Sequence, residues 1–323
     1  MLRACFAVLA ALILIAPGAS ALNFTNLYVF GDSIVDVGNT QNLLGGPGSG
    51  GDPTPAADGY LDGRFTNGLN PADILNIAIE GVAMTDLAAG GDNYAYGGAR
   101  GRDNSGALPP LTADAIPDLA AQVSLFSGDV GGVADPNALY MINVGGNDIF
   151  DALTLAANNL NPLQPINDAV AAITASILSL QAMGAEQILF VGVGDVGAPP
   201  AANGAEAAGL FFSNNINSAI QAALPNKVKF FDTIALFDDV LANPTLYGLP
   251  AGLLTEVSCL NGGGADPGGP PTCDDYAFFD DVHPTTQVLS ILGNELVAFV
   301  PEPGTGVLLG LGLVGLAARR RAA

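Results

Sequence analysis

Short runs of hydrophobic residues alternate along this chain with longer stretches in which hydrophobic positions recur at helical spacing. The short runs are continuously apolar and rich in β-branched and aromatic residues, as strands buried on both faces of a sheet are. The longer stretches have the spacing of amphipathic helices. The pattern predicts strands over 27–30, 139–144, 187–193 and 228–231, and helices over 166–183, about 206–223 and 285–299.

Strands that alternate with helices form β–α–β units, so the pattern predicts one α/β domain with a mainly parallel sheet. Glycine and polar residues follow the first two strands, at 31–33 and 145–148. In open parallel sheets, ligands bind at the edge where strands end, which makes these residues candidates for a site. Two Gly/Pro-rich stretches, 45–59 and 261–272, are expected to be surface loops because sheet units lie on both sides of them.

The first 21 residues have the layout of a secretory signal peptide. Arg3 precedes an apolar run over 4–15, and Ala-Ser-Ala at 19–21 matches a small-x-small cleavage site. The run of 12 residues is short for a membrane-spanning helix, which needs about 20. We therefore expect residues 1–21 to be removed on export and the folded domain to comprise residues 22–300.

Residues 301–323 combine three features in order. Pro-Glu-Pro at 301–303 precedes an apolar, glycine-rich stretch over 304–318 and three arginines at 319–321. An apolar segment followed by basic residues is typical of a segment held in a membrane with its basic residues in the cytoplasm. The combination resembles the PEP-CTERM sorting signal of Gram-negative bacteria, which an exosortase cleaves near the PEP and whose hosts commonly make extracellular polysaccharide. A plain C-terminal membrane anchor is the alternative.

This resemblance also implies a location. It implies export through the inner membrane of a Gram-negative bacterium, followed by residence in the periplasm, at the cell surface or in the extracellular matrix. An exosortase-type processing enzyme is the implied partner at the C-terminus.

The composition narrows the range of partners and cofactors. The chain has 9 Lys+Arg against 31 Asp+Glu, and without its end segments it keeps five basic and 30 acidic residues, because Arg3, Glu302 and three arginines are lost. Nucleic-acid-binding proteins carry a basic surface, so we expect no nucleic acid partner. One histidine excludes a histidine-rich metal site, and no cysteine spacing suits zinc. We expect neither a metal nor an organic cofactor.

Two cysteines remain once the signal peptide, which contains Cys5, is removed. Cysteine pairs in exported domains are commonly oxidised. A disulfide between Cys259 and Cys273 would close a loop of about 15 residues and stabilise the fold by about 3 kcal/mol. We therefore predict this disulfide.

A nucleophile and a base can be assigned from the sequence. His283 is the single histidine, and Asp280 stands three positions before it, where a carboxylate can orient an imidazole that acts as a base. A surface histidine near a helix cap is the alternative. Ser33 is the candidate nucleophile, because it follows a predicted strand in a Gly-Asp-Ser turn that would expose it at the sheet edge. Alternatively, Ser33 caps a helix that begins at about Ile34. The GxSxG signature of α/β-hydrolases is absent from the sequence.

If a serine attacks an ester carbonyl, N–H groups must stabilise the negative charge that develops on the carbonyl oxygen. Gly97 and Gly98 offer backbone N–H groups unobstructed by a side chain, and Asn147 offers a side-chain amide directly after a predicted strand. Each of these residues alone is more often a turn residue.

A GxGxxG pattern at 192–197 follows a predicted strand, as in dinucleotide-binding sites. The two prolines after it oppose an immediate helix, and no acidic residue that would bind a ribose occurs between Glu206 and Asp232. The same pattern recurs at 310–315 inside the apolar tail. We therefore interpret 192–197 as a turn beside the candidate site.

Together, these blocks occur in an order typical of one family. The sequence resembles SGNH (GDSL) hydrolases in FGDSIVDVGNT at 30–40, GRFTNG at 63–68, NYAYGGA at 93–99, NVGGND at 143–148, YGL at 247–249 and FFDDVHPT at 278–285. The leucine of the GDSL signature is replaced here by Ile34. The resemblance implies a three-layer α/β/α sandwich with a mainly parallel, flavodoxin-like sheet.

The resemblance also implies a mechanism, hydrolysis of a carboxylic ester through an acyl-enzyme without a cofactor. The substrate would be a lipid, a short-chain ester or an acylated carbohydrate. The DxxH spacing of the family selects Asp280, and not Asp281, as the acid. A non-catalytic surface or exopolysaccharide-associated protein on the same fold is the alternative. The implied residues are the nucleophile Ser33, the base His283, its orienting acid Asp280, and the oxyanion donors Ser33 N–H, Gly98 (with Gly97 as alternate) and Asn147.

Overall fold

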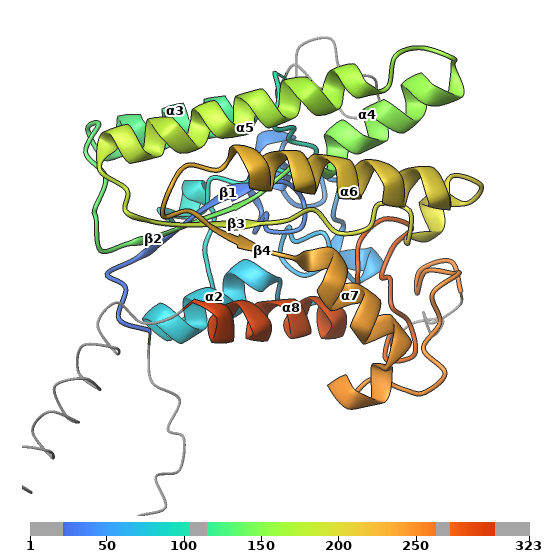
Figure 1. The fold of residues 1–323 in the computed structure, drawn as a ribbon. Coiled ribbons are helices and arrows are strands. Elements are labelled where there is room, and N and C mark those ends of the chain that lie inside the picture. Colours follow the sequence, from blue (N-terminus) through green and yellow to red (C-terminus); the bar gives the residue numbers. More distant parts are fainter. Residues whose placement is uncertain (1–21, 104–114, 263–271, 301–323) are drawn as a thin grey trace, which may run out of the picture.

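The computed structural model describes residues 22–103, 115–262 and 272–300, which are arranged in three layers (Figure 1). The predicted signal peptide, 1–21, and the predicted sorting segment, 301–323, lie outside the described residues. All the predicted strands and site residues lie inside them.

A parallel sheet of four strands forms the middle layer. The strands are hydrogen-bonded in chain order, and their ends differ from the predicted ends by at most two residues. All five residues of β2 are buried, as expected for a strand in a sheet covered on both faces. The strands are β1 (Leu27–Gly31), β2 (Leu139–Asn143), β3 (Gln187–Val191) and β4 (Lys229–Phe231).

The segment 92–96 runs along the free side of β1. This places the segment that comes next in the chain on one side of β1 and the later strands on its other side, which is the order of a flavodoxin-like sheet. Ligands bind in such sheets where the strand order reverses, here at the ends of β1 and β2. The backbone hydrogen bonds join Val29 to Asp92 and Tyr94, and Gly31 to Tyr96.

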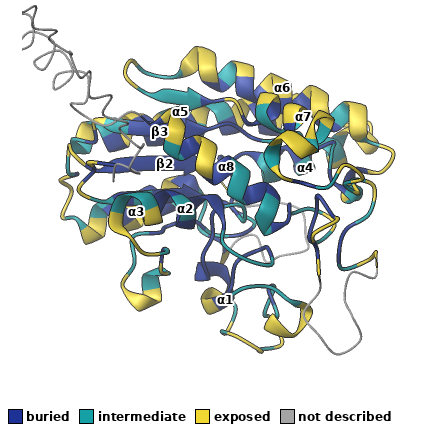
Figure 2. Cartoon of the chain, turned by 90° about the horizontal axis from the view of Figure 1, so that it is seen from below, coloured by how far each residue is buried: buried dark blue, intermediate teal, exposed yellow. Residues whose placement is uncertain are grey.

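Helices cover both faces of the sheet, whose central strands β2 and β3 are mostly dark blue in Figure 2 because their residues are buried. One face carries α3 (Leu119–Asp129), α4 (Gly146–Ala157), α5 (Leu163–Met183) and α6 (Glu206–Ala223). The other carries α2 (Pro71–Glu80), α7 (Thr233–Ala242) and α8 (Thr286–Phe299). The short elements are α1 (Asn39–Leu43) and 3₁₀ turns at Ala56–Asp58, Leu87–Ala89, Pro200–Ala202 and Pro244–Tyr247. The structure therefore has the predicted three-layer α/β/α architecture.

Among the described residues, α5 is the one helix long and apolar enough to cross a membrane by length and composition. It contacts α3, α4 and α6, and seven of its residues are buried. In the domain, α5 is therefore a packed helix of the outer layer.

Ser33 does not cap a helix. Residues 32–35 form a turn, and the next helix, α1, begins at Asn39. The helix-cap alternative for Ser33 is therefore wrong, because the chain turns sharply after β1 and does not continue as a helix.

Candidate active site

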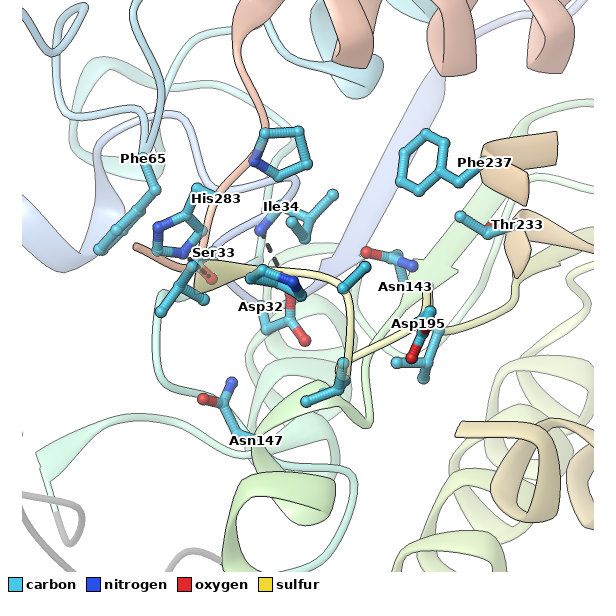
Figure 3. Close-up of a pocket in the computed structure, with 18 of the residues that line it drawn as sticks. Asp32, Ser33, Ile34, Phe65, Asn143, Asn147, Asp195, Thr233, Phe237 and His283 are labelled. Atoms are coloured by element: carbon cyan, nitrogen blue, oxygen red, sulfur yellow. Dashed lines mark hydrogen bonds between the residues drawn. The ribbon is translucent and has the colours of Figure 1, made fainter. Parts of the chain in front are cut away.

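The turn that carries Ser33 begins where β1 ends. At Gly31 a Cβ atom would lie 2.2 Å from the Asn143 carbonyl oxygen of the neighbouring strand, so this position requires glycine. The Asp32 N–H donates to that carbonyl at 3.1 Å, and the Ile34 N–H donates to the Asp32 carboxylate at 3.2 Å. These contacts place Ser33 in a cavity beyond the sheet edge (Figure 3).

Ser33, His283 and Asp280 form a continuous hydrogen-bonded chain. Nε2 of His283 lies 2.8 Å from Oγ of Ser33, although the two residues are 250 positions apart. Nδ1 of His283 lies 2.9 and 2.8 Å from the two carboxylate oxygens of Asp280. With the ring proton on Nδ1, which faces a carboxylate, Nε2 is left to accept the hydroxyl proton of Ser33. This arrangement can activate a serine for nucleophilic attack.

The Asp280 carboxylate is held in its ionised form. Burial alone would raise its pKa, but the interaction with His283 and the N–H groups of His283 and Val282 outweigh burial and lower the pKa to about 2. The two N–H groups donate at 2.7 and 2.8 Å, and the Tyr60 hydroxyl donates to the same carboxylate at 2.8 Å. A carboxylate with this pKa stays charged while the neighbouring imidazole gains and loses a proton.

The neighbouring Asp281 faces other partners. Its carboxylate accepts hydrogen bonds from the Ser258 hydroxyl and the Asn261 side chain, both at 2.7 Å. The structure therefore brings Asp280, and not Asp281, to the imidazole of His283.

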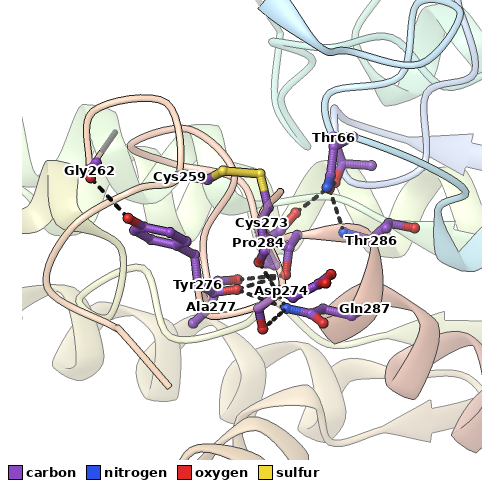
Figure 4. The surroundings of a disulfide bond; sticks show 12 residues. Thr66, Cys259, Gly262, Cys273, Asp274, Tyr276, Ala277, Pro284, Thr286 and Gln287 are labelled. Atoms are coloured by element: carbon purple, nitrogen blue, oxygen red, sulfur yellow. Dashed lines mark hydrogen bonds between the residues drawn. A yellow bond between two sulfur atoms is a disulfide. The ribbon is translucent and has the colours of Figure 1, made fainter. Parts of the chain in front are cut away.

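The segment 63–68 (GRFTNG) contacts the loop that carries His283. The Thr66 hydroxyl donates to the Pro284 carbonyl oxygen at 2.8 Å (Figure 4). The Phe65 ring lies 5.2 Å from the imidazole ring of His283, measured between centroids. These contacts fix the loop at Pro284 and pack a ring against the imidazole.

A disulfide between Cys259 and Cys273 lies beside the same loop (Figure 4). The Cys259 N–H donates to the Phe278 carbonyl oxygen at 2.9 Å, just before Asp280. The Cys273 carbonyl oxygen accepts a hydrogen bond of 3.0 Å from Gln287 in the first turn of α8. The disulfide therefore joins two segments that are hydrogen-bonded to opposite ends of the loop that carries Asp280 and His283.

Gly98 and Asn147 line the same cavity as Ser33, and Gly97 does not. The Gly97 N–H donates to the buried carboxylate of Asp36 at 2.9 Å, so it is already paired. Within the described residues, no acceptor is bonded to the backbone N–H of Ser33 or of Gly98. The Asn147 amide donates one hydrogen bond of 2.9 Å to a backbone carbonyl oxygen, which leaves its second N–H for another acceptor. Three donors can therefore serve an oxyanion in this cavity.

Buried ion pairs brace the two segments that carry these donors. Asp148, in the first turn of α4, is buried and accepts the Gly101 N–H at 2.8 Å. Asp151, also in α4, accepts two hydrogen bonds of 2.6 and 3.0 Å from Arg100 and pairs with Arg102. The start of α4 is thereby fixed to the loop that carries the glycine donor.

Asp32 is a buried carboxylate directly before Ser33. Burial raises its pKa to about 6, although the N–H groups of Ile34 and Gly146 and the nearby imidazole oppose the rise. Because Gly146 directly precedes Asn147, Asp32 connects the turn of the serine to the loop of the amide donor. Asp32 is therefore placed to position both.

A cavity of about 580 Å³ opens at Ser33. Ser33, His283 and Asn147 lie toward one end, and Phe237 and Thr233 of α7 lie toward the other (Figure 3). A cavity of this size is typical of small-molecule sites. Its hydrophobic lining includes Ile34, Phe65, Val193, Phe237, Leu241, Val288 and Leu292.

The 192–197 turn forms part of this lining, and no helix starts directly after it. The 3₁₀ turn Pro200–Ala202 separates it from α6, which begins at Glu206. The feature that binds a pyrophosphate, a helix N-terminus at the end of the motif, is therefore missing from this described segment. No cluster of three or more metal-binding side chains occurs in the described part of the chain.

Sequence reasoning did not single out the residues that support the site, among them Asp32, Asp36, Tyr60 and Phe65. They lie within or next to the recognised blocks 30–40 and 63–68. Asp36 contacts Gly97 61 positions away, and Tyr60 contacts Asp280 220 positions away. Spacing along the chain carries no signal for contacts of this kind.

Comparison with known proteins identifies the family. The family model for GDSL-like lipase/acylhydrolase matches residues 27–296, and the PEP-CTERM protein-sorting motif matches residues 299–321. Two GDSL esterase/lipases of Arabidopsis thaliana are 26% and 25% identical to this chain over 83% and 84% of its length and 85% and 86% of their own. Both resemblances noted in the sequence are thus confirmed.

Proposed function

The chain belongs to the GDSL-like lipase/acylhydrolase family, and from that membership we propose that it is an exported serine esterase that hydrolyses carboxylic esters through an acyl-enzyme. One observation carries the proposal: the hydrogen-bonded chain from Ser33 through His283 to Asp280 lies at one end of a largely apolar cavity. The names of the plant relatives, esterase/lipase, agree with chemistry on esters.

In the first step, Ser33 attacks the ester carbonyl carbon while His283 takes its hydroxyl proton. Asp280 stabilises the imidazolium that forms and keeps the ring in one orientation. The tetrahedral oxyanion accepts hydrogen bonds from the N–H groups of Ser33 and Gly98 and from the side-chain amide of Asn147. His283 then donates its proton to the leaving alcohol, and the acyl group remains on the serine.

In the second step, water attacks the acyl-enzyme. His283 takes the proton of the water, the same donors stabilise the second oxyanion, and the acid leaves as Ser33 regains its proton. The paired state of the Gly97 N–H supports Gly98 as the backbone donor.

We further propose that the acyl chain of the substrate occupies the hydrophobic end of the cavity. That end includes Phe237 and Leu241 of α7 and Leu292 of α8. An acetyl group would leave much of this surface uncovered, whereas each CH₂ buried there contributes about 0.8 kcal/mol. We therefore expect kcat/KM to rise from acetyl esters to longer acyl chains until the cavity is filled.

The sorting motif indicates export and sorting in a Gram-negative bacterium. We propose that residues 1–21 direct the export and that an exosortase-type enzyme processes the C-terminus. The enzyme would then act in the periplasm, at the cell surface or in the extracellular matrix.

Initial hydrolysis rates test this proposal. Wild type and Ser33→Ala are compared on nitrophenyl esters from acetyl to palmitoyl and on an acetylated polysaccharide. We expect turnover that vanishes in Ser33→Ala, with a preference for acyl chains longer than acetyl. A folded wild type without turnover on any ester would contradict the esterase, and a preference for the polysaccharide would contradict the acyl-chain assignment.

A further inference from the structure

Helix α2 connects the active-site edge of the sheet to the opposite edge. It begins next to the turn of the nucleophile, where the Asn70 side chain donates to the Asp36 carbonyl oxygen at 2.9 Å. It ends beside Leu22, the first described residue, whose N–H donates to the Ala78 carbonyl oxygen at 3.2 Å. Leu22 precedes β1, so this end of α2 lies where the strands begin.

Helix α8 runs beside α2 in the same direction. At its start, the Thr286 hydroxyl donates to the Leu69 carbonyl oxygen at 2.8 Å, just before α2. In its middle, Gly293 packs so closely on Ile74 that a Cβ there would lie 2.7 Å from the Ile74 side chain. A helix of 14 residues is about 21 Å long, so α8 ends about that far from the active-site edge.

The chain therefore leaves the domain at the edge opposite Ser33. Val300, directly after α8, is 2% exposed and belongs to the same hydrophobic cluster as Leu22 and Leu296. The sorting motif matches from residue 299, so it begins in the last turn of this anchored helix.

Very little chain separates the domain from its predicted anchor. Three residues, 301–303, lie between the buried Val300 and the apolar stretch 304–318. Three extended residues span about 10 Å, and two of these three are prolines with a restricted backbone. A bilayer that holds 304–318 thus holds the domain close to its Val300 edge.

We propose that, as long as residues 304–318 hold the uncut chain in a membrane, the protein stands with this edge facing the membrane and its active site facing away. In this anchored state its substrates are esters outside the anchoring bilayer, dissolved or carried on a polymer. The helix length places Ser33 about 20 Å above the attached edge, beyond the reach of an ester within that bilayer. The orientation follows from the position of α8, whereas the substrate class rests on the proposed function.

Energy transfer to the membrane surface tests the orientation without using activity. The chain from residue 22 to 323 is placed in lipid vesicles with an acceptor dye in the headgroup region. A donor dye is attached to Val82→Cys, beside the end of α2, or to Ala201→Cys, at the cavity; both native side chains are exposed. We expect several-fold more efficient transfer from position 82. Equal or stronger transfer from position 201 would overturn the orientation.

Hydrolysis by the same vesicles tests the substrate class. One ester is embedded in the anchoring bilayer, and a water-soluble ester with the same acyl group is added outside. We expect rapid hydrolysis of the soluble ester and slow hydrolysis of the embedded one. A flexible Gly/Ser linker of about 40 residues after Val300, with a mean span of about 35 Å, is expected to restore hydrolysis of the embedded ester.

Equal rates on the embedded ester with and without the linker would overturn the proposal. Loss of activity on the soluble ester would contradict the esterase function instead, and the energy-transfer result would still decide the orientation. Ser33→Ala in the same vesicles measures the background rate.

Discussion

At the residue scale, two adjacent aspartates have different surroundings. Asp280 lies against both Nδ1 and the N–H of His283, whereas the Asp281 carboxylate contacts Ser258 and Asn261. The two positions therefore form a matched pair for testing which acid orients the base.

We expect Asp280→Asn to lower kcat by about 10³- to 10⁴-fold, because an amide neither stabilises the imidazolium nor selects the ring tautomer. Asp281→Asn should keep most of the activity, since its amide oxygen still accepts the bonds from Ser258 and Asn261. Steady-state rates on a soluble ester, with circular dichroism to verify folding, make the comparison. Equal losses in the two variants would refute Asp280 as the orienting acid.

Asp32 gives the stability a pH dependence of defined sign. Burial raises its pKa from 3.8 to about 6 in the folded protein, so the folded state binds this proton more tightly than the unfolded chain does. The protonated carboxyl group of Asp32 therefore stabilises the folded state below pH 3.8, and this stabilisation is lost as the pH rises through 6. Relative to Asp32→Asn, the free energy of unfolding of wild type should fall by about 2 kcal/mol between pH 4 and pH 7.

Urea unfolding of both proteins at several pH values measures this difference. The amide of Asp32→Asn does not titrate, so the variant removes the contribution of this one group. Parallel stability profiles for the two proteins would show that folding does not raise the pKa of Asp32.

Some of these residue roles could be predicted from sequence and others could not. Ser33 and the pair Asp280 and His283 belong to short motifs whose spacing itself indicates the chemistry. The choice between Gly97 and Gly98 depends on Asp36, which takes the Gly97 N–H from 61 positions away. Such a contact is visible only after the chain has folded.

At the scale of elements, the contact between Phe65 and Gly97 links two segments of the site. A Cβ atom at Gly97 would lie 2.3 Å from two atoms of the Phe65 ring, which also packs on His283. A change at Gly97 therefore acts on the imidazole through the ring.

Gly97→Ala should lower the free energy of unfolding by about 1–3 kcal/mol and lower kcat as well, because Phe65 must move toward or away from His283. Gly128→Ala in α3 is the matched control, since nothing lies within 4 Å of its Cβ position. Urea unfolding and ester hydrolysis measure both effects. Equal stability and activity in the two variants would contradict this prediction, because the Phe65 ring would then move without loss of stability or activity.

Reduction of the disulfide should destabilise the domain by about 3 kcal/mol, as expected for a closed loop of this length. Because Cys259 and Cys273 lie beside the loop of Asp280 and His283, we also expect kcat to fall. Thermal unfolding and hydrolysis with and without dithiothreitol measure these changes. The double variant Cys259→Ala/Cys273→Ala should not respond to the reductant. Free thiols in the exported protein would disprove the bond.

The strands could be predicted because their apolar runs are continuous, and three long helices because their hydrophobic positions recur at helical spacing. Helices α2, α3, α4 and α7 were not predicted. Helix α4 begins with Gly146 and has no side-chain cap, so its start has the composition of a turn. Helix α2 has only ten residues, and its signal was the capping box of Asn70 and Asp73. Short helices of this kind form because they pack on the sheet, which composition alone does not indicate.

For the molecule as a whole, the ion pairs of the arginines leave few basic side chains on the surface, so the surface is strongly acidic. Of five basic residues in 22–300, three are arginines in buried or largely buried ion pairs, which leaves Lys227 and Lys229 against the many carboxylates. Such a surface repels anionic polymers and favours solubility. The net charge could be predicted from sequence, but the burial of the arginines could not. We therefore expect neutral esters to be better substrates than anionic ones.

Covalent labelling with a fluorophosphonate, followed by peptide mass spectrometry, tests most directly whether Ser33 is the nucleophile. We predict one adduct per chain, located on Ser33, with complete loss of hydrolysis. Labelling should be abolished in Ser33→Ala and much slower in His283→Ala, because the hydroxyl then lacks its base. An adduct on another residue, or full hydrolysis by a folded Ser33→Ala, would contradict the assignment of Ser33 as the nucleophile.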